Sequence, residues 1–164
     1  MELSLAILNG GKGSRLGGRD KGQLRYQGRT LLERLLDLGA LCRETLVITE
    51  DVVPGKGAPG GVVTALLKAS TPHVLVVAAD MPFVTVEAVQ PLIATRGAAL
   101  FGDEPFPGIY LAEWGPTWRD RLVTNPSMRE LVASSPFTHV KLEDPRVVES
   151  VNTPEQARRL GFNL

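Results

Sequence analysis

The sequence has little cysteine and little histidine, and this scarcity excludes two common ways of building a small protein. Cys42 is the single cysteine, so no intramolecular disulfide can form. With His73 and His139 as the only histidines, the chain also lacks the clustered Cys/His pattern of a zinc site. We therefore expect Cys42 to be a small buried hydrophobic residue.

Long apolar segments are also missing. The longest wholly apolar run, Val74 to Ala79, is far shorter than the roughly 20 residues that a helix needs to cross a bilayer. Met1 to Leu8 has no basic stretch followed by a long apolar block, the pattern of a secretory signal. We expect no membrane association and a cytoplasmic location.

Net charge is absent, because 18 basic and 18 acidic residues cancel. Such a chain has no overall field to attract nucleic acid or an anionic membrane, and neither is expected as a partner. The 164 residues, 43% hydrophobic and 22% charged, match an ordinary soluble protein. This length predicts a single domain, residues 1–164, with one substantial core.

The order of sequence patterns along the chain predicts alternating strands and helices. Apolar runs predict strands over 3–8, 45–49, 73–79, 98–101, 109–112 and 147–151. Capping patterns and apolar spacing predict helices after Thr30, over 62–69, over 85–90, after Asn125 and over 155–160. For the fourth of these, Asn125 precedes a proline, and Ser127 and Glu130 again have capping-box spacing. The unbroken apolarity of 73–79 is typical of a strand that is covered on both faces. The sequence therefore predicts an α/β fold, a three-layer α/β/α arrangement with a mostly parallel sheet.

The segment 8–21, LNGGKGSRLGGRDK, is the strongest candidate for a functional loop. It follows the first predicted strand, and between Gly10 and Arg29 basic residues exceed acidic ones by six to one. Glycines allow backbone N–H groups to converge on a phosphate without a Cβ in the way. The spacing matches neither a Walker P-loop nor the dinucleotide fingerprint. A nucleophile elbow needs glycines two positions before and after the serine, where Ser14 has Lys12 and Leu16.

A nucleoside triphosphate with magnesium is the ligand that this loop favours. Arg15 and Lys21 supply cations, and Asp80 follows the predicted strand 73–79. The carboxyl ends of parallel strands meet at one edge of a sheet, so Asp80 is expected near the loop. Amides and cations would bind phosphate oxygens, and the carboxylate would bind the metal. The alternative, a flexible connection with scattered charges, is less consistent with this combination.

Four segments resemble the molybdenum cofactor guanylyltransferases. The string LNGGKGSRLGGRDKG is similar to that family's Leu-x-Gly-Gly-x-x-x-Arg-Met/Leu-Gly-x-Asp-Lys signature. In the same order follow Asp51-x-x-Pro54-Gly55-Lys56-Gly57, then ADMPF at 79–83, and finally VNTPE at 151–155. The resemblance runs from about Leu5 to Leu160 and covers nearly the whole chain.

The resemblance implies a Rossmann-like nucleotidyltransferase fold and an enzyme that transfers GMP from GTP to the terminal phosphate of molybdopterin, with release of pyrophosphate. It implies GTP and molybdopterin as substrates, Mg²⁺ as cofactor, and other proteins of molybdenum cofactor biosynthesis or acceptor proteins as partners. Arg15, Lys21 and Asp80 would be catalytic, with Asp80 the metal ligand. The nucleotide would be bound by a larger set: Leu8, Asn9, Gly10, Gly11, Ser14, Arg15, Lys21, Asp51 and Asp80.

Several departures from the family pattern leave alternatives open. Asn9 replaces a common alanine and either hydrogen-bonds the base or caps the strand end. Asn152 either faces the acceptor or caps the last helix. The segment between Thr49 and Asp51 is shorter than in the family, and APGG at 58–61 replaces Pro-Leu-x-Gly. A related transferase that uses CTP or another phosphorylated acceptor, and a nucleotide-binding module without turnover, are the competing interpretations.

Overall fold

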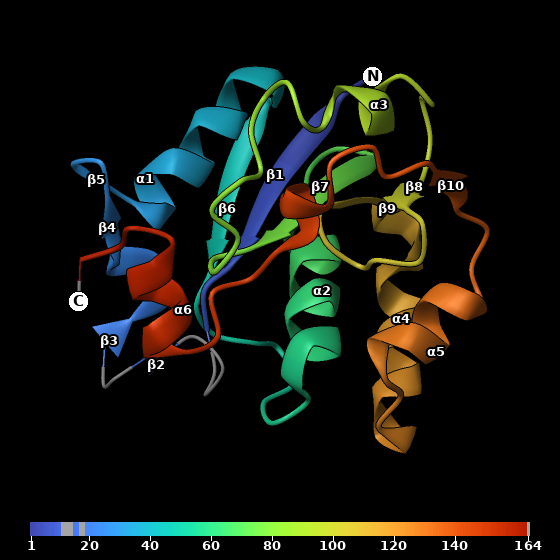
Figure 1. Ribbon diagram of the computed structural model, residues 1–164. Coiled ribbons are helices and arrows are strands. Elements are labelled where there is room, and N and C mark those ends of the chain that lie inside the picture. Colours follow the sequence, from blue (N-terminus) through green and yellow to red (C-terminus); the bar gives the residue numbers. More distant parts are fainter. Residues whose placement is uncertain (11–14, 17–18, 164) are drawn as a thin grey trace.

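The computed structural model describes residues 1–10, 15–16 and 19–163, and for residues 15, 16 and 19 the backbone. In this part of the chain a six-stranded sheet has the order β10-β8-β9-β7-β1-β6 (Figure 1). Its strands are β1 (Leu3–Leu8), β6 (Glu44–Ile48), β7 (His73–Ala78), β8 (Ala99–Phe101), β9 (Gly108–Leu111) and β10 (Thr138–Val140). Two small hairpins add β2 (Arg15–Leu16), β3 (Arg19–Asp20), β4 (Arg25–Tyr26) and β5 (Arg29–Thr30).

The sheet is mostly parallel. β1 pairs in parallel with both β6 and β7, and β8 pairs in parallel with β10. β9 runs antiparallel between β7 and β8. The α-helices are α1 (Leu31–Leu36), α2 (Gly57–Lys68), α3 (Gln90–Ile93), α4 (Gly115–Arg121), α5 (Met128–Ala133) and α6 (Pro154–Arg159).

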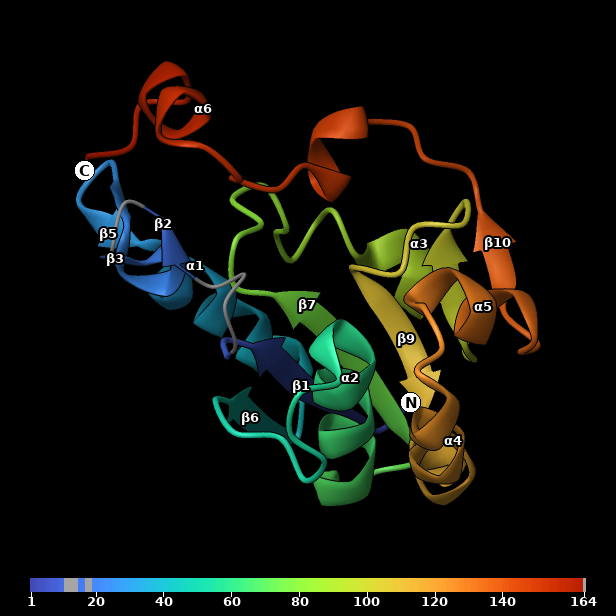
Figure 2. The same ribbon diagram turned by 90° about the horizontal axis from the view of Figure 1, so that it is seen from below.

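Helices cover both faces of the sheet, and the side chains of its central strands alternate between two cores. Leu5 of β1 and Leu75 of β7 pack with Leu35 of α1 on one face. Ala6 and Val76 pack with Val63 of α2 on the other. Figure 2 shows α2 and α4 together on one side of the sheet. The three-layer prediction is therefore confirmed, and the apolar run 73–79 is explained by burial on both faces.

Local sequence signals explain where several elements begin. Thr30 accepts a hydrogen bond from the Glu33 amide at 3.0 Å, and the Glu33 carboxylate accepts from the Thr30 amide at 3.4 Å. This capping box starts α1 as predicted. Thr153 caps α6 in the same way through the Gln156 amide.

Four predicted elements differ from the structure. Helix α2 begins at Gly57 and not at 62, so that Gly60 and Gly61, predicted as part of a loop, lie inside the helix. The predicted helix 85–90 is not formed: residues 86–89 are turns, and Gln90 begins α3. Pro91 lies in the first turn of α3, where its missing N–H costs nothing. The predicted strand 147–151 is not formed, because Asp144 and Pro145 start a 3-10 helix over 145–148 and residues 149–151 are irregular. Asn125 does not cap a helix: it adopts a left-handed conformation (φ 52°) and ends a 3-10 helix. The predicted cap at Ser127 is confirmed, because its side chain accepts a hydrogen bond from the Glu130 amide at the start of α5.

Candidate active site

The site lies where β1 and β7 end. The Asn9 amide donates to the Ile48 carbonyl at 2.8 Å, and the Ala79 amide donates to the Leu8 carbonyl at 3.0 Å. These bonds extend the parallel ladders one residue beyond the strands, so the chain leaves β1 and β7 side by side. Asp80 follows at this edge, as the sequence predicts.

A buried ion pair joins this edge to the end of the glycine-rich segment. Lys21 Nζ donates to Asp80 Oδ2 at 3.2 Å and to Asn152 Oδ1 at 3.4 Å. The Lys21 side chain is only 6% exposed, and the Asp80 side chain is 19% exposed. Three segments that are far apart in the sequence therefore meet at one ammonium group.

Lys21 is held in place by a tight local turn. It begins a 3-10 helix, Lys21–Gln23, in which the Asp20 carboxylate accepts a hydrogen bond from the Gly22 amide at 2.9 Å. The turn is close to Asn9, since a Cβ on Gly22 would lie 3.1 Å from Asn9 Oδ1. Glycine at position 22 thus allows the turn to pack against the end of β1.

One carboxylate oxygen of Asp80 is not paired within the described chain. Its Oδ1 atom is buried, and among the described residues it has no hydrogen-bond partner. A buried carboxylate oxygen without a partner is costly unless a ligand satisfies it. Magnesium is commonly held by one or two carboxylates together with substrate phosphates, so the donor set here suits that ion. The described residues contain no group of three or more His, Cys, Asp or Glu that would form a complete metal cage.

A cavity of about 730 Å³ opens beside the ion pair. Among its lining residues are five of the predicted site residues: Leu8, Gly10, Lys21, Asp51 and Asp80. Its volume is in the range of sites for small molecules and cofactors. The first turns of α2 contribute Gly57, Ala58 and Gly61, and Phe106 and Ser150 complete other parts of the wall.

The amino end of α2 faces this cavity without a side-chain cap. Lys56 occupies the capping position and makes no side-chain cap hydrogen bond. The first N–H groups of a helix have no partner within the helix and favour an anion or a polar ligand atom. Gly60 and Gly61 let the helix approach closely, because a Cβ there would lie 3.2 Å from Asp51 Oδ2 and 3.4 Å from the Leu8 side chain, respectively.

Asp51 lines the cavity as a partly desolvated carboxylate. Burial raises its pKa above the ordinary value, and the positive charge of Lys68 opposes that rise. A carboxylate near a helix amino end and a cavity wall is suited to accept hydrogen bonds from the hydroxyl or amino groups of a ligand.

The remaining predicted site residues stand as follows. Asn9 is 8% exposed and does not appear among the lining residues of the cavity, and its Oδ1 atom has no hydrogen-bond partner within the described chain. Gly11 and Ser14 lie outside the described residues, and Arg15 is described by its backbone in β2. Asn152 contacts Lys21, whereas Thr153 caps α6.

Sequence reasoning did not find Phe106, Ser150 or the 3-10 turn as parts of this region. Phe106 precedes Pro107 in a loop between β8 and β9, and no local motif marks it. The position of Phe106 follows only from the sheet topology. Strand β9 runs antiparallel beside β7, so the loop before β9 lies at the edge of the sheet where β7 ends.

The fold and this site together define a class. Within the described residues, an open, mostly parallel sheet has helices on both faces and a ligand-sized cavity at its carboxyl edge, an arrangement typical of nucleotide-binding α/β folds. Two solved structures share it. Molybdopterin-guanine dinucleotide biosynthesis protein A from Archaeoglobus fulgidus matches with a TM-score of 0.74 and 20% identity, over 96% of each chain. A 2-C-methyl-D-erythritol 4-phosphate cytidylyltransferase from Thermus thermophilus matches with a TM-score of 0.69 and 23% identity, over 98% of each chain.

The family follows from the sequence match. The model of the MobA-like NTP transferase domain matches residues 5–132, and the chain belongs to that family. The sequence-based resemblance is thereby confirmed.

Curated relatives agree with this family. The chain is 38% identical to a probable molybdenum cofactor guanylyltransferase from Chloroflexus aggregans, in an alignment that covers 67% of this chain. A relative of the same name from Flavobacterium johnsoniae is 26% identical, in an alignment that covers 99% of this chain and 98% of that protein. The first two relatives, from Chloroflexus aggregans and Clostridium perfringens, are matched over 60% and 52% of their own length. The chain thus spans little more than half of these two proteins.

Proposed function

We propose that this protein transfers GMP from GTP to the terminal phosphate of molybdopterin and releases pyrophosphate. The observation that carries the proposal is the Lys21–Asp80 pair, 3.2 Å apart, at the wall of a cavity that Leu8, Gly10 and Asp51 also line. The family membership and the names of the curated relatives support the same reaction.

The reaction needs no nucleophilic side chain. An oxygen of the acceptor phosphate forms a bond to the α-phosphorus of GTP, and the bond from that phosphorus to the β-phosphate bridging oxygen breaks. The electron pair leaves with pyrophosphate. Catalysis then consists of aligning two anions and neutralising the charge on the transferred group and the leaving group.

Lys21 is the cation whose place in the structure is suited to this task. An ammonium has three donors, and Asp80 and Asn152 account for two of them in the described chain. A third is available for a phosphate oxygen in the cavity. Arg15 would supply the second positive charge, as the family signature implies. Gly10, with Gly11 and Ser14, would bring loop amides to the phosphates.

Asp80 would hold Mg²⁺ through Oδ1, the buried oxygen without a partner. Bound there with the triphosphate, the ion would neutralise phosphate charge and orient the oxygens. Asp51 and the amino end of α2 would bind the nucleoside, because they line the same cavity as the ion pair.

The test combines binding with turnover. GTP with Mg²⁺ should raise the melting temperature more than CTP or ATP at equal concentration, since a ligand stabilises the state that it binds. With molybdopterin present, pyrophosphate release should be seen. Asp80→Asn should lower turnover by about 10²- to 10³-fold, the typical cost of losing one electrostatic stabiliser.

Asp103→Asn is the matched control, because the Asp103 side chain is 93% exposed and pairs only with His139 in the described chain. Circular dichroism confirms that each variant is folded at the assay temperature. A larger shift with CTP would overturn the choice of GTP. Nucleotide binding without pyrophosphate release would indicate a binding module, and full activity in Asp80→Asn would contradict the metal role.

A further inference from the structure

A second cavity, of about 470 Å³, has no lining residue in common with the first, but Pro82 and Phe83 in its wall follow closely after Asp80 of the first. Its wall is built from the segment that follows Asp80, from residues 141–147, and from Arg34 of α1. The volume is sufficient for a fused ring system, since ligand sites begin at roughly 300 Å³.

The chemistry of this cavity is that of a site for a flat, polar ring. Pro82, Phe83 and Leu142 provide apolar surface, and Phe83 is partly exposed. The Arg146 guanidinium lies over the Phe83 ring, 5.8 Å from its centre. A planar guanidinium next to an aromatic ring suits a heteroaromatic ligand that stacks against this pair and accepts hydrogen bonds at its edge.

Hydrogen bonds within the protein fix the positions of Arg146 and Arg34 in the cavity wall. Asp144 orients Arg146, because its carboxylate accepts from Arg146 Nε at 3.2 Å and from an Arg146 NH2 group at 2.9 Å. Arg34 donates to the Tyr26 carbonyl at 3.4 Å and to Gln27 at 3.3 Å. Its Nε atom is buried and, across the residues with described side chains, has no acceptor.

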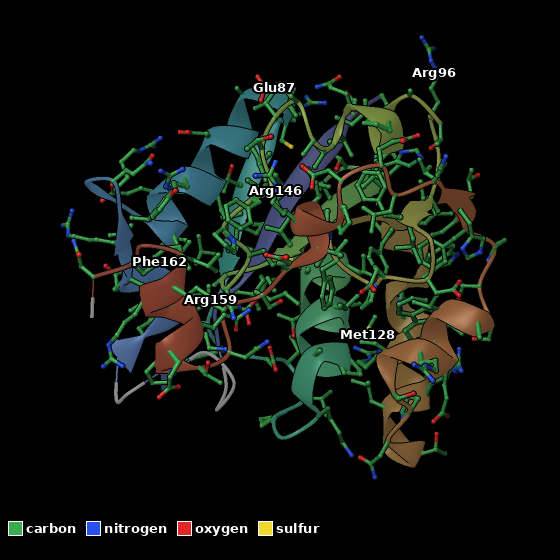
Figure 3. All side chains as sticks on the ribbon, viewed as in Figure 1. Glu87, Arg96, Met128, Arg146, Arg159 and Phe162 are labelled. Carbon is green, nitrogen blue, oxygen red and sulfur yellow. The ribbon has the colours of Figure 1, made fainter. Side chains whose placement is uncertain are left out.

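Two wall residues of the second cavity follow Asp80 of the ion pair closely in the sequence. Pro82 and Phe83 follow Asp80 by two and three residues, so their backbone lies within about 11 Å of Asp80. On the other side, the segment that carries Arg146 continues to Val151, whose amide donates to the Asp80 carbonyl at 2.8 Å. Figure 3 labels Arg146 on this segment, which Figure 1 shows passing the end of β7 on its way to α6.

We propose that the second cavity holds the ring end of the acceptor, a flat heteroaromatic phosphate monoester, while its phosphate reaches Lys21 and Asp80. Phe83 and Arg146 are then the residues that select the acceptor. This inference rests on the proposed guanylyl transfer, because that reaction requires an acceptor whose phosphate lies next to the nucleotide. Beyond that reaction, the inference states where the acceptor ring binds and which side chains recognise it.

Binding of free pterin, 2-amino-4-oxopteridine, tests the cavity without any turnover. Its fluorescence is titrated with the wild-type protein, Phe83→Ala, Arg146→Gln and the control Arg43→Gln. Arg43 matches Arg146 closely, since both are ion-paired and their side chains are 67% and 66% exposed. Loss of one aromatic contact should weaken pterin binding about tenfold. Arg146→Gln should weaken it by a similar factor, and Arg43→Gln should leave it unchanged.

Steady-state kinetics separate this inference from the proposed function. In Phe83→Ala and Arg146→Gln, the KM for molybdopterin should rise about tenfold, by the same loss of one contact, while the KM for GTP stays constant. If the wild-type protein shows no transfer at all, the proposed function fails. The pterin titration still shows whether the second cavity binds a pterin ring. Absence of pterin binding to the wild-type protein, or equal affinity in all four proteins, would overturn the inference. Arg146→Gln changes an exposed side chain and so remains informative if Phe83→Ala does not fold.

Discussion

At the scale of single residues, the Lys21–Asp80 pair shows how function and stability are linked. The ammonium is more deeply buried than the carboxylate, with side-chain exposures of 6% and 19%. A buried charge is tolerated because its partner compensates for the lost hydration, so removal of either partner leaves an uncompensated charge. The two single substitutions are not equivalent, however, because Asp80 keeps more contact with water than Lys21.

Asp80→Asn is therefore predicted to destabilise the protein by about 3 kcal/mol, and Lys21→Met by less, since breaking a fully buried pair costs roughly 3–5 kcal/mol. The double variant should be more stable than the sum of the two single losses predicts. Urea unfolding of the four proteins measures this double-mutant cycle. Strict additivity would show that the two groups are not coupled in the folded state, and a greater loss in Lys21→Met would contradict the argument from burial.

At the scale of elements, the site depends on how closely the ends of neighbouring strands approach. Gly10 follows β1 and contacts the residue after β6, because a Cβ on Gly10 would lie 2.7 Å from the Thr49 carbonyl oxygen. Real Cβ atoms do not come so close to backbone. The turn out of β1 can begin beside β6 only with glycine at position 10, and the glycine-rich segment starts from this turn.

Gly10→Ala is predicted to cost about 1–3 kcal/mol, the usual penalty for overpacking, and to weaken GTP binding because the loop is displaced. Gly97→Ala is the matched control. A Cβ on Gly97 meets nothing within 4 Å, and its backbone is not left-handed. That variant should be neutral or slightly stabilised, since alanine restricts the unfolded chain. Urea unfolding and GTP titration of both variants provide the measurement, and equal effects would rule out the steric explanation.

At the scale of the whole molecule, the sequence predicts best where one local signal determines the structure. The uninterrupted apolarity of 73–79 can be satisfied only by burial on both faces, and the Thr30/Glu33 spacing places a helix start within one residue. Elements whose structure depends on tertiary contacts were predicted wrongly. The apolar residues Val147 and Val151 are buried at 8% and 0% exposure, as in a strand, yet they cover the core from a 3-10 helix and a loop.

The candidate site divides in the same way. The strand-end position of Asp80 could be predicted from topology, because parallel strands bring their carboxyl ends together. The link from Lys21 to Asn152 spans 131 positions and depends on the packing of α6 against the β4–β5 hairpin. The periodicity of the sequence does not reveal this link. The family motifs brought Asn152 to attention without deciding between its two roles.

This packing makes the carboxyl-terminal segment a determinant of nucleotide binding. Phe162 is 4% exposed in a small cluster with Leu24 and Leu31, and its ring lies 5.0 Å from that of Tyr26. The same cluster includes Val151, next to Asn152. Loss of the Phe162 ring should therefore loosen the segment around Val151 and Asn152, whose Asn152 side chain accepts a hydrogen bond from Lys21.

Phe162→Ala is predicted to cost about 3 kcal/mol, the lower end for a buried phenylalanine, and to lower GTP affinity as well. Phe137→Ala is the control, because Phe137 is similarly buried, at 8% exposure, but packs against Tyr110 and Trp114 in a different cluster. It should lower stability without changing GTP affinity. Hydrogen exchange should show faster opening of residues 150–163 in Phe162→Ala alone. If both variants lose affinity equally, the effect is one of general stability, and the positioning of Lys21 by the carboxyl-terminal segment is disproved.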